Sequence, residues 1–315
     1  MKALICGVSG QDGAYLARLL LGQGYQVVGT SRDATVMGFG ALQRLGIRQH
    51  VTTVSMAIND FRSVLSTLER HEPDEIYNLA GQTSVGLSFE QPVETIDSVV
   101  GGTLNLLEAI RFTRRAIRFY NAGSGEAFGD TGDIPATEDT RFQPRSPYAV
   151  AKASACWLVR NYRESYGLAA CTGILFNHES PLRPERFVTK KIVLAARRIK
   201  AGSDERLRLG NIDIQRDWGW APEYVAAMQA MMAAGAQRDY IVATGRTESL
   251  RYFVEKAFAY FDLDWLRHTE VDQAMLRPSD ISSSRASPER TQRELGWAAT
   301  ADVDAVIARM CDDEL

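Results

Sequence analysis

The sequence predicts an α/β fold of the Rossmann type, in which a doubly wound parallel sheet carries a smaller C-terminal substrate-binding lobe. Three observations predict it. Short apolar runs alternate with amphipathic runs through the first half of the chain, as strands alternate with helices. The apolar runs are nearly continuous, which is typical of strands buried on both faces. Glycines follow the first run at regular spacing, at the point where a helix should begin.

The expected elements form a β–α repeat. Strands are expected at residues 2–6, 25–30, 50–54, 74–80, 117–122 and 169–176. Helices are expected at residues 15–24, 61–71, 102–113 and 148–165. Past residue 177 the periodicity weakens, and the remaining expectations are helices near 188–200, 224–232 and 249–261 and a strand near 240–245. We therefore expect a dinucleotide-binding domain over residues 1–177. Residues 178–315 should form mainly a substrate lobe, partly interleaved with the first domain.

The composition argues against several classes of protein. The 315 residues carry a net charge of −3, which argues against nucleic-acid binding because that requires a basic face. No apolar run approaches the roughly 18 residues that suggest a membrane span. The four cysteines have no metal-binding spacing, so we expect no metal site and reduced thiols in a cytoplasmic protein; they are Cys6, Cys156, Cys171 and Cys311.

The segment "CGVSGQDGAYLARLL" has the form of a dinucleotide-binding turn. Gly7 permits the tight turn, Gly10 lets the backbone approach a pyrophosphate, and Gly13 allows close packing of helix on strand. The N-terminus of the following helix then offers free N–H groups to the phosphates.

The residues after the second strand bear on the choice of cofactor. An acidic side chain there binds the ribose 2′-hydroxyl of NAD, whereas arginine suits the 2′-phosphate of NADP. Arg32 is followed at once by Asp33, so the two residues point to different cofactors. We favour NADP, and NAD stays open.

The segment "SPYAVAKASACW" places Tyr148 and Lys152 four residues apart, on one face of the expected helix. A nearby ammonium and a nicotinamide charge favour the phenolate and should lower the tyrosine pKa from its usual value of about 10. Tyr148 could then accept a proton from a substrate hydroxyl. Ser124, in "AGSGE" at the end of the preceding strand, should face the same crevice.

Together these residues resemble the extended, sugar-nucleotide branch of the short-chain dehydrogenase/reductases, with "NLAGQTSV" (78–85) as a further landmark. The stretches "GILFNHESPLRPERFVTKK" (173–191) and "RDWG" (216–219) resemble the GDP-mannose 4,6-dehydratase family, and the likeness spans nearly the whole chain. For the cofactor site, the resemblance implies Gln11, Asp12, Leu79 and Ala80 beside the three glycines, Arg32, Tyr148 and Lys152.

The family reaction converts GDP-mannose to GDP-4-keto-6-deoxymannose and water, with the nicotinamide regenerated. Hydride exchange alone needs no carboxylate beside the serine. Elimination does, because a base must remove the C5 proton and an acid must protonate the leaving C6 hydroxyl. The resemblance gives both tasks to Glu126. It further implies that the catalytic residues are Ser124, Glu126, Tyr148 and Lys152, and that the substrate-binding residues are Thr83, Asn177, Arg183, Val188, Lys191, Arg216, Arg277 and Asp280.

The chain also departs from the family pattern. Gly125 stands where the family usually has serine, and Ser124 where it has threonine. The loop "RDATVMGFGA" lacks one of the family's adjacent arginines, which bears on NADP and on tetramer formation. Subunit pairing through helices near 92–112 and 148–165 would give a homodimer or homotetramer. Two alternatives stay open: a GDP-sugar 4-keto reductase or epimerase, and a catalytically silent sensor on the same fold.

Overall fold

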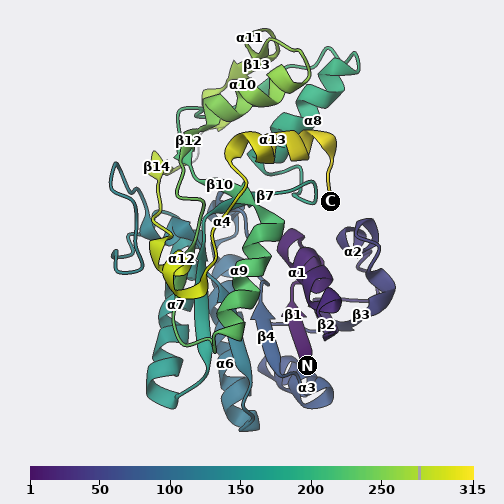
Figure 1. Ribbon diagram of the computed structural model, residues 1–315, viewed down its shortest axis with the longest axis vertical. Coiled ribbons are helices and arrows are strands. Elements are labelled where there is room, and N and C mark those ends of the chain that lie inside the picture. Colours follow the sequence, from purple (N-terminus) through teal and green to yellow (C-terminus); the bar gives the residue numbers. More distant parts are fainter. Residues whose placement is uncertain (276–277) are drawn as a thin grey trace.

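The computed structural model describes residues 1–275 and 278–315. Within these residues, seven parallel strands form the central sheet in the order β11-β6-β5-β4-β1-β2-β3 (Figure 1). The order reverses beside β1, which is the arrangement of a doubly wound sheet. The bounds of the strands are β1 Lys2–Cys6, β2 Gln26–Ser31, β3 Val51–Ser55, β4 Glu75–Asn78, β5 Arg118–Ala122, β6 Ala170–Leu175 and β11 Tyr240–Val242.

Helices cover both faces of this sheet. One face packs against α1 (Gln11–Gly22), α2 (Gly40–Arg44) and α9 (Ala221–Ala233), whose apolar side chains form one buried cluster with β1 and β2. The other face packs against α3 (Phe61–His71), α6 (Gly102–Thr113) and α7 (Pro147–Tyr166). This two-faced burial is the reason that the strands are apolar throughout.

The helix expected at 92–112 is not uniform. It begins as α5 (Pro92–Ile96), passes through a π-helical turn η2 (Asp97–Gly101) and continues as α6. The turn lies over the end of β4, where Ser98 Oγ accepts a hydrogen bond of 3.3 Å from the N–H of Gln82. Such π-turns inside longer helices are frequent at functional sites.

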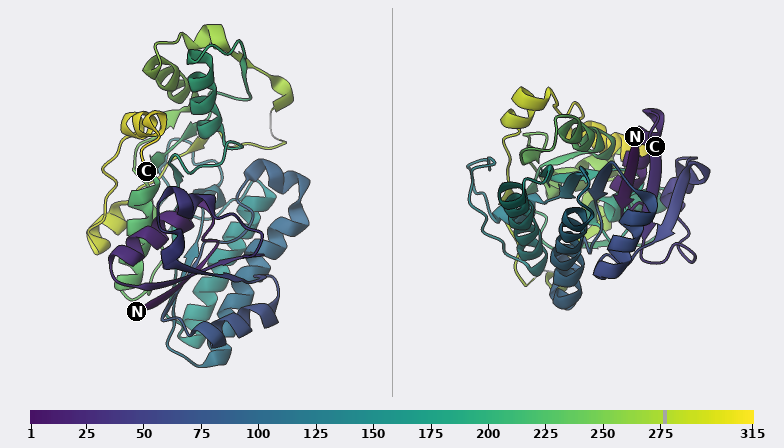
Figure 2. Two further views of the ribbon diagram at one scale, coloured as in Figure 1. Left: turned by 90° about the vertical axis from the view of Figure 1, so that its right-hand side faces the viewer. Right: turned by 90° about the horizontal axis from the view of Figure 1, so that it is seen from below.

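A second hydrophobic core lies beyond the sheet. It is built by α8 (Val188–Lys200), α10 (Leu250–Tyr260) and α13 (Val303–Asp312). Figures 1 and 2 show this lobe stacked over the end of the sheet toward which the strands run. Other short elements of the chain are β7 Asn177–Glu179, β8 Leu207–Leu209, β9 Gln215–Arg216, β10 Trp218–Trp220, β12 Glu248–Ser249, α11 Trp265–His268, β13 Thr269–Val271 and β14 Ser283–Ser284, together with α4 Val85–Glu90, which packs on α7, and α12 Glu289–Leu295, which packs on β11.

The predicted fold class is confirmed, and the long elements agree with expectation to within a few residues. The chain crosses between the two cores: α9 packs on α1, and β11 pairs with β6 in the main sheet, although both follow residue 177. Apart from β11, which was expected near 240–245, the two- and three-residue strands were not predicted, because so short a segment has no readable period. All four cysteines are free and buried. Among the described residues, no helix is long and apolar enough to span a membrane.

Candidate active site

The glycine turn lies at the carboxyl end of β1. Gly7 has φ +83°, a left-handed conformation that favours glycine, and a Cβ there would stand 2.9 Å from the carbonyl oxygen of Leu79 and 3.1 Å from Cα of Ala80. A Cβ on Gly13 would stand 2.4 Å from the Gly7 carbonyl oxygen. The turn therefore packs Gly7 against Leu79 and Ala80, which follow β4. It leaves no space for a side chain on Gly7 or Gly13.

Gly10 differs from its two neighbours in the motif. A Cβ there would meet only the Gly7 carbonyl oxygen, at 3.4 Å, and no side chain caps the N-terminus of α1. The first N–H groups of α1 thus border open space, where an anion is favoured by the helix dipole. This cradle fits the pyrophosphate of a dinucleotide.

The side chains of Gln11 and Asp12 turn toward β7. The Nε2 atom of His178 lies 2.8 Å from Asp12 Oδ2, and Ser180 Oγ donates to Gln11 Oε1 at 2.8 Å. Burial is the largest influence on the pKa of Asp12 and would raise it, but the charge and hydrogen bond of His178 lower it to about 2. The sequence stretch "FNHES" contained His178 and Ser180, yet no local pattern connected them with α1.

Arg32 and Asp33, the two residues directly after β2, each contact a different neighbour. The Arg32 side chain is 82% exposed and pairs with Glu94 of α5 at 2.9 Å. Asp33 instead accepts hydrogen bonds from the N–H and Oγ1 of Thr35, which lower its pKa. Both side chains are exposed, Arg32 in contact with Glu94 and Asp33 with Thr35.

Ser124 and Glu126 lie on a short 3₁₀ turn, η3 (Gly125–Phe128), directly after β5. Ser124 caps the turn by accepting a hydrogen bond of 3.3 Å from the N–H of Glu126. Gly125 packs against an aromatic ring: a Cβ there would stand 3.0 Å from atoms of Phe176. The capping bond fixes the serine and the glutamate relative to each other, and the glycine allows the turn to lie close to Phe176.

Tyr148 and Lys152 meet Ser124 from α7. The Ser124 side chain is close enough to the Tyr148 hydroxyl to act on its pKa, and Lys152 Nζ donates to the carbonyl oxygen of Ala122 at 2.8 Å. Burial raises the pKa of Tyr148 to about 12, against the lowering effect of Ser124, while burial lowers the pKa of Lys152 to about 8. In the protein alone, desolvation of the phenol keeps this pKa high, and the lowering expected from Lys152 together with a nicotinamide charge stays a prediction.

Arg216 joins Glu126 to the C-terminal segment. Its guanidinium is buried, with Nε 3.9 Å from Glu126 Oε1 and Nη2 3.1 Å from Asp280 Oδ1. Nη1 donates to the carbonyl oxygen of Ile281 at 3.0 Å. Three residues that were expected from separate motifs thus form one charged cluster beside Ser124.

The other expected substrate residues surround β7 and α8. Arg183 pairs with the buried Glu179 at 3.2 Å, and Lys191 Nζ donates to the carbonyl oxygen of Arg208 at 2.8 Å. Asn177 begins β7, Val188 is the first residue of α8, and Thr83 is exposed on the loop before α4. Arg277 lies outside the described residues.

Asp217 is a buried residue of the site that the sequence did not reveal by itself. Its carboxylate accepts the N–H groups of Thr244 at 3.0 Å and Gly245 at 2.8 Å, and burial raises its pKa to about 6. Asp217 therefore ties the end of β9, the strand that carries Arg216, to the loop after β11. The "RDWG" motif was noted, but the loop that its aspartate binds lies 27 residues away and gave no signal.

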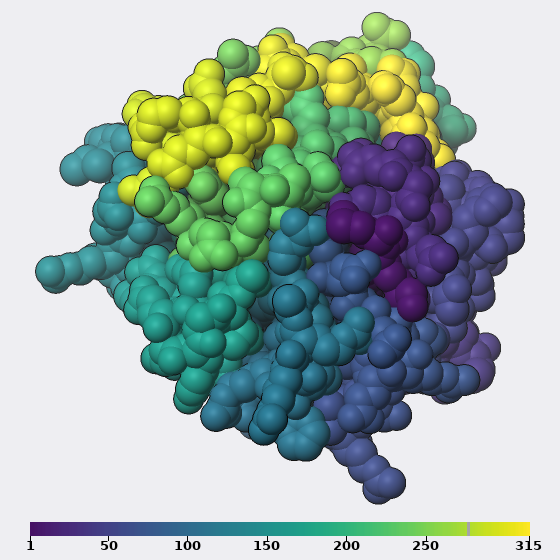
Figure 3. Space-filling model, turned by 60° about the horizontal axis from the view of Figure 1, so that its bottom comes forward, coloured from purple at the N-terminus to yellow at the C-terminus, as the bar shows by residue number. Residues whose placement is uncertain are grey.

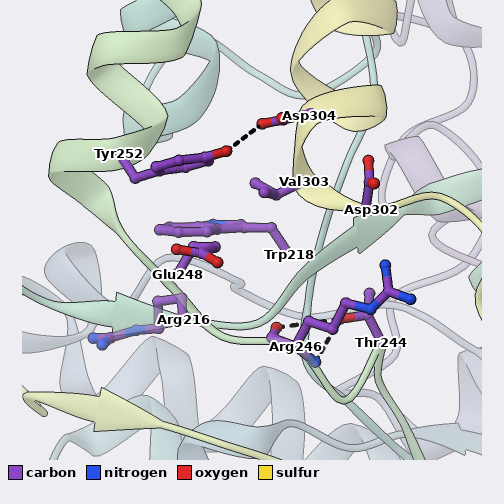
Figure 4. A pocket seen from close by; sticks show the side chains of 9 residues that line it. All are labelled: Arg216, Trp218, Thr244, Arg246, Glu248, Tyr252, Asp302, Val303 and Asp304. Atoms are coloured by element: carbon purple, nitrogen blue, oxygen red, sulfur yellow. Dashed lines mark hydrogen bonds between the residues drawn. The ribbon is translucent and has the colours of Figure 1, made fainter.

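A cavity of about 190 Å³ lies beside β9 and β10, between α10 and the start of α13. Figure 4 shows the rings of Trp218 and Tyr252 on one side, with the guanidinium of Arg216 turned away from Arg246 and Thr244. Arg216 is the one expected site residue that lines it. Within residues 1–275 and 278–315, no group of three or more His, Cys, Asp or Glu side chains could hold a metal ion.

Comparison with known proteins identifies the family. The family described as GDP-mannose 4,6 dehydratase matches residues 4–310. GDP-mannose 4,6 dehydratase 1 of Arabidopsis thaliana is 42% identical, with 99% of this chain and 89% of the relative covered. GDP-mannose 4,6-dehydratase of Sinorhizobium fredii is 41% identical, with 99% and 96% covered.

Solved structures agree with this assignment at the level of fold. A dTDP-glucose 4,6-dehydratase from Bacillus anthracis in complex with NAD has a TM-score of 0.86 at 18% identity, covering 99% of this chain and 96% of that one. The RMD protein of Pseudomonas aeruginosa, complexed with NADPH, has a TM-score of 0.80 at 23% identity and the same coverage. From the match over almost its full length, the chain belongs to the GDP-mannose 4,6-dehydratase family.

Proposed function

We propose that the protein is a nucleotide-sugar 4,6-dehydratase that converts GDP-mannose to GDP-4-keto-6-deoxymannose and water. Family membership supports the substrate class. The observation that carries the reaction type is the position of Glu126, fixed two residues after Ser124 on one capped turn and 3.9 Å from Arg216. A plain reductase or epimerase has no use for a carboxylate at this place.

The first step assigned to the chain is removal of the C4 hydroxyl proton. Tyr148 accepts it, and Ser124, which lies beside the tyrosine hydroxyl, polarises the C4 oxygen. A bound nicotinamide dinucleotide would take the hydride from C4 and return it to C6, and its positive charge, with the Lys152 ammonium, favours the phenolate form of Tyr148. Lys152, anchored on the Ala122 carbonyl, is assigned to the nicotinamide ribose.

The second step is elimination, and we assign it to Glu126. Oxidation at C4 makes the C5 proton acidic, and the carboxylate removes it. The same group, now protonated, gives the proton to the C6 hydroxyl, which leaves as water. Return of the hydride to C6 would then require a proton at C5, and the proton that Tyr148 took from the C4 hydroxyl balances the reaction. One carboxyl group can act in both directions because it is regenerated by the second transfer. Arg216 beside it favours the ionised form in the resting site.

The diphosphate of the substrate is assigned to the cations near β7 and α8. Arg183, which pairs with Glu179 and lies over the ring of Phe187, and Lys191, which donates to one carbonyl, both have further donors, and arginine binds phosphate in a bidentate manner. Arg216 and Asp280 extend this surface toward the nucleotide ribose. Asn177, Val188, Thr83 and Arg277 complete the proposed substrate contacts.

For the cofactor we propose NADP, with Arg32 as the partner of its 2′-phosphate. The exposed guanidinium at the end of β2 supports this choice. Asp33 favours NAD as the second candidate, because a carboxylate there repels a phosphate. Mass spectrometry of the dinucleotide released from the purified protein decides between them: NADP supports Arg32, and NAD alone contradicts it.

We further propose that the subunits pair through α6 and α7, which lie side by side on one face (Figure 3). Each helix leaves large apolar side chains in solvent, among them Phe112, 66% exposed, and Trp157, 55% exposed. Contiguous apolar patches of this kind mark interaction sites. A monomer in sedimentation analysis would contradict the proposal; a dimer that Phe112→Glu dissociates would support it.

The reaction is tested by incubation of the protein with GDP-mannose and a panel of other nucleotide hexoses, with mass spectrometry of the products. Loss of one water from GDP-mannose supports the dehydratase. A product of unchanged mass, or one that differs by two hydrogens, would favour the epimerase or reductase. No turnover of any nucleotide hexose would favour the silent sensor.

A further inference from the structure

Both ring nitrogens of His178 face oxygen atoms: a backbone carbonyl, which only accepts hydrogen bonds, and the side chain of Asp12, which only accepts them as a carboxylate. The Nδ1 atom of His178 lies 2.7 Å from the carbonyl oxygen of Phe176, and its Nε2 lies 2.8 Å from Asp12 Oδ2. The residue is 7% exposed, so water does not replace either partner. A neutral imidazole has one donor and one acceptor nitrogen, whereas both nitrogens of the cation donate. The geometry therefore requires two donors, and the cation supplies them.

Asp12 is correspondingly placed as the anion. Its Oδ1 accepts a hydrogen bond of 2.9 Å from Gln11 Nε2, so both of its oxygens face donors. Gln11 Nε2 also donates to the His178 carbonyl oxygen at 3.2 Å, and Ser180 Oγ donates to Gln11 Oε1. The first turn of α1 is thus bonded to β7 and the residue after it through both side chains and the backbone.

We propose that His178 is a positioning residue: as an imidazolium it neutralises Asp12 at the N-terminus of α1 and ties the cofactor-binding turn to the strand that carries substrate contacts. The physical reason is electrostatic. A helix N-terminus attracts the phosphates of a dinucleotide, and an unneutralised carboxylate in its first turn opposes that attraction. The ligands in this statement rest on the proposed function, but the charge state of the ring does not.

The surroundings of the ring support this charge state. Burial, the largest influence, lowers the pKa of His178, but the charge and hydrogen bond of Asp12 bring it above its usual value, against the opposing charge of Arg183. Arg183 is itself paired with Glu179. From α9 the ring of Tyr224 stacks on the imidazole, with centroids 4.5 Å apart.

The charge state is tested by nitrogen NMR on the full protein labelled at histidine. The chain has four histidines, and His178→Gln assigns the signal. At pH 6.5 both ring nitrogens of His178 should resonate as protonated. Asp12→Asn should convert the ring to the neutral form. A neutral His178 at pH 6.5 in the unmodified protein would overturn the proposal, whatever the enzyme's activity.

The role of the pair is tested by dinucleotide affinity, measured by calorimetry with NADP and with NAD. His178→Gln keeps a donor toward Asp12 but removes the cation, and we expect about tenfold weaker binding or more. Asp12→Asn combined with His178→Gln removes both charges and should restore most of the affinity. His50→Gln is the matched control and should bind normally. A double variant that binds no better than His178→Gln would show that packing, and not charge, is responsible, and would overturn the proposal.

Discussion

The two halves of the candidate site are built by different means. The cofactor half consists of backbone: a positive φ at Gly7, close approach at Gly13 and uncapped N–H groups at the start of α1. The substrate half consists of buried charges, in which Arg216 meets Glu126 and Asp280, and Arg183 meets Glu179. The Asp12–His178 pair is the point at which the halves join.

The difference reflects the free-energy cost of each half. Glycines leave space at modest conformational cost, so the glycine turn of the cofactor half can be formed by residues that are close in sequence. Buried ions must be matched by partners from distant segments, because an unpaired buried charge is strongly unfavourable. The substrate half should therefore be the more sensitive to a single substitution, and three variants test this ranking.

The largest effect on stability is expected for Arg216→Ala. It leaves Glu126 and Asp280 without the buried guanidinium, at a cost of about 3–5 kcal/mol in the free energy of unfolding. Urea denaturation measures it. The exposed pair of Arg251 with Asp213 is the control, and Arg251→Ala should change stability by less than about 1 kcal/mol. Equal effects of the two variants would contradict the distinction between buried and surface charge.

A smaller effect is expected for Gly13→Ala in the cofactor half. The added Cβ would overlap the backbone of Gly7 and Val8, so α1 must shift, at a cost of about 1–3 kcal/mol and with loss of dinucleotide binding. Gly22→Ala, in the same helix but with open space around it, should stabilise by about 0.5–1 kcal/mol. Thermal unfolding measures the stability of the two variants, and calorimetry measures their dinucleotide binding. Equal stability and equal binding would mean that the turn tolerates a side chain.

The third variant should gain stability, by an amount no larger than the loss expected for Gly13→Ala. Lys152 is buried and its pKa is lowered from 10.5 to about 8, so the folded chain holds this proton less tightly than the unfolded chain. The destabilisation caused by the buried ammonium is fully present below pH 8 and disappears by about pH 10.5. Lys152→Met should therefore raise stability by about 2 kcal/mol at pH 7, after loss of the bond to Ala122, and abolish turnover. A stability gain that does not shrink between pH 8 and 10 would contradict this explanation.

The sequence predicted the cofactor half in detail, because glycine spacing after an apolar strand is a local signal. It also placed Tyr148 and Lys152 on one helix face. It could not show that Arg216, Glu126 and Asp280 meet, since their segments are far apart in the chain and the strand carrying Arg216 is two residues long. Nor did it reveal the partner of Asp12 in His178, 166 residues away, or the use of Asp217 as an anchor for the loop after β11.

The most direct test of the proposed reaction is Glu126→Gln with GDP-mannose deuterated at C4. The unmodified enzyme should release water and carry the deuterium to C6. In the variant, elimination should fall by about 10²-fold or more, because the amide cannot move a proton, while removal of deuterium from C4 stays detectable as reduced nicotinamide. Elimination at the unmodified rate in Glu126→Gln would contradict the assignment of this carboxylate and, with it, the account of the site.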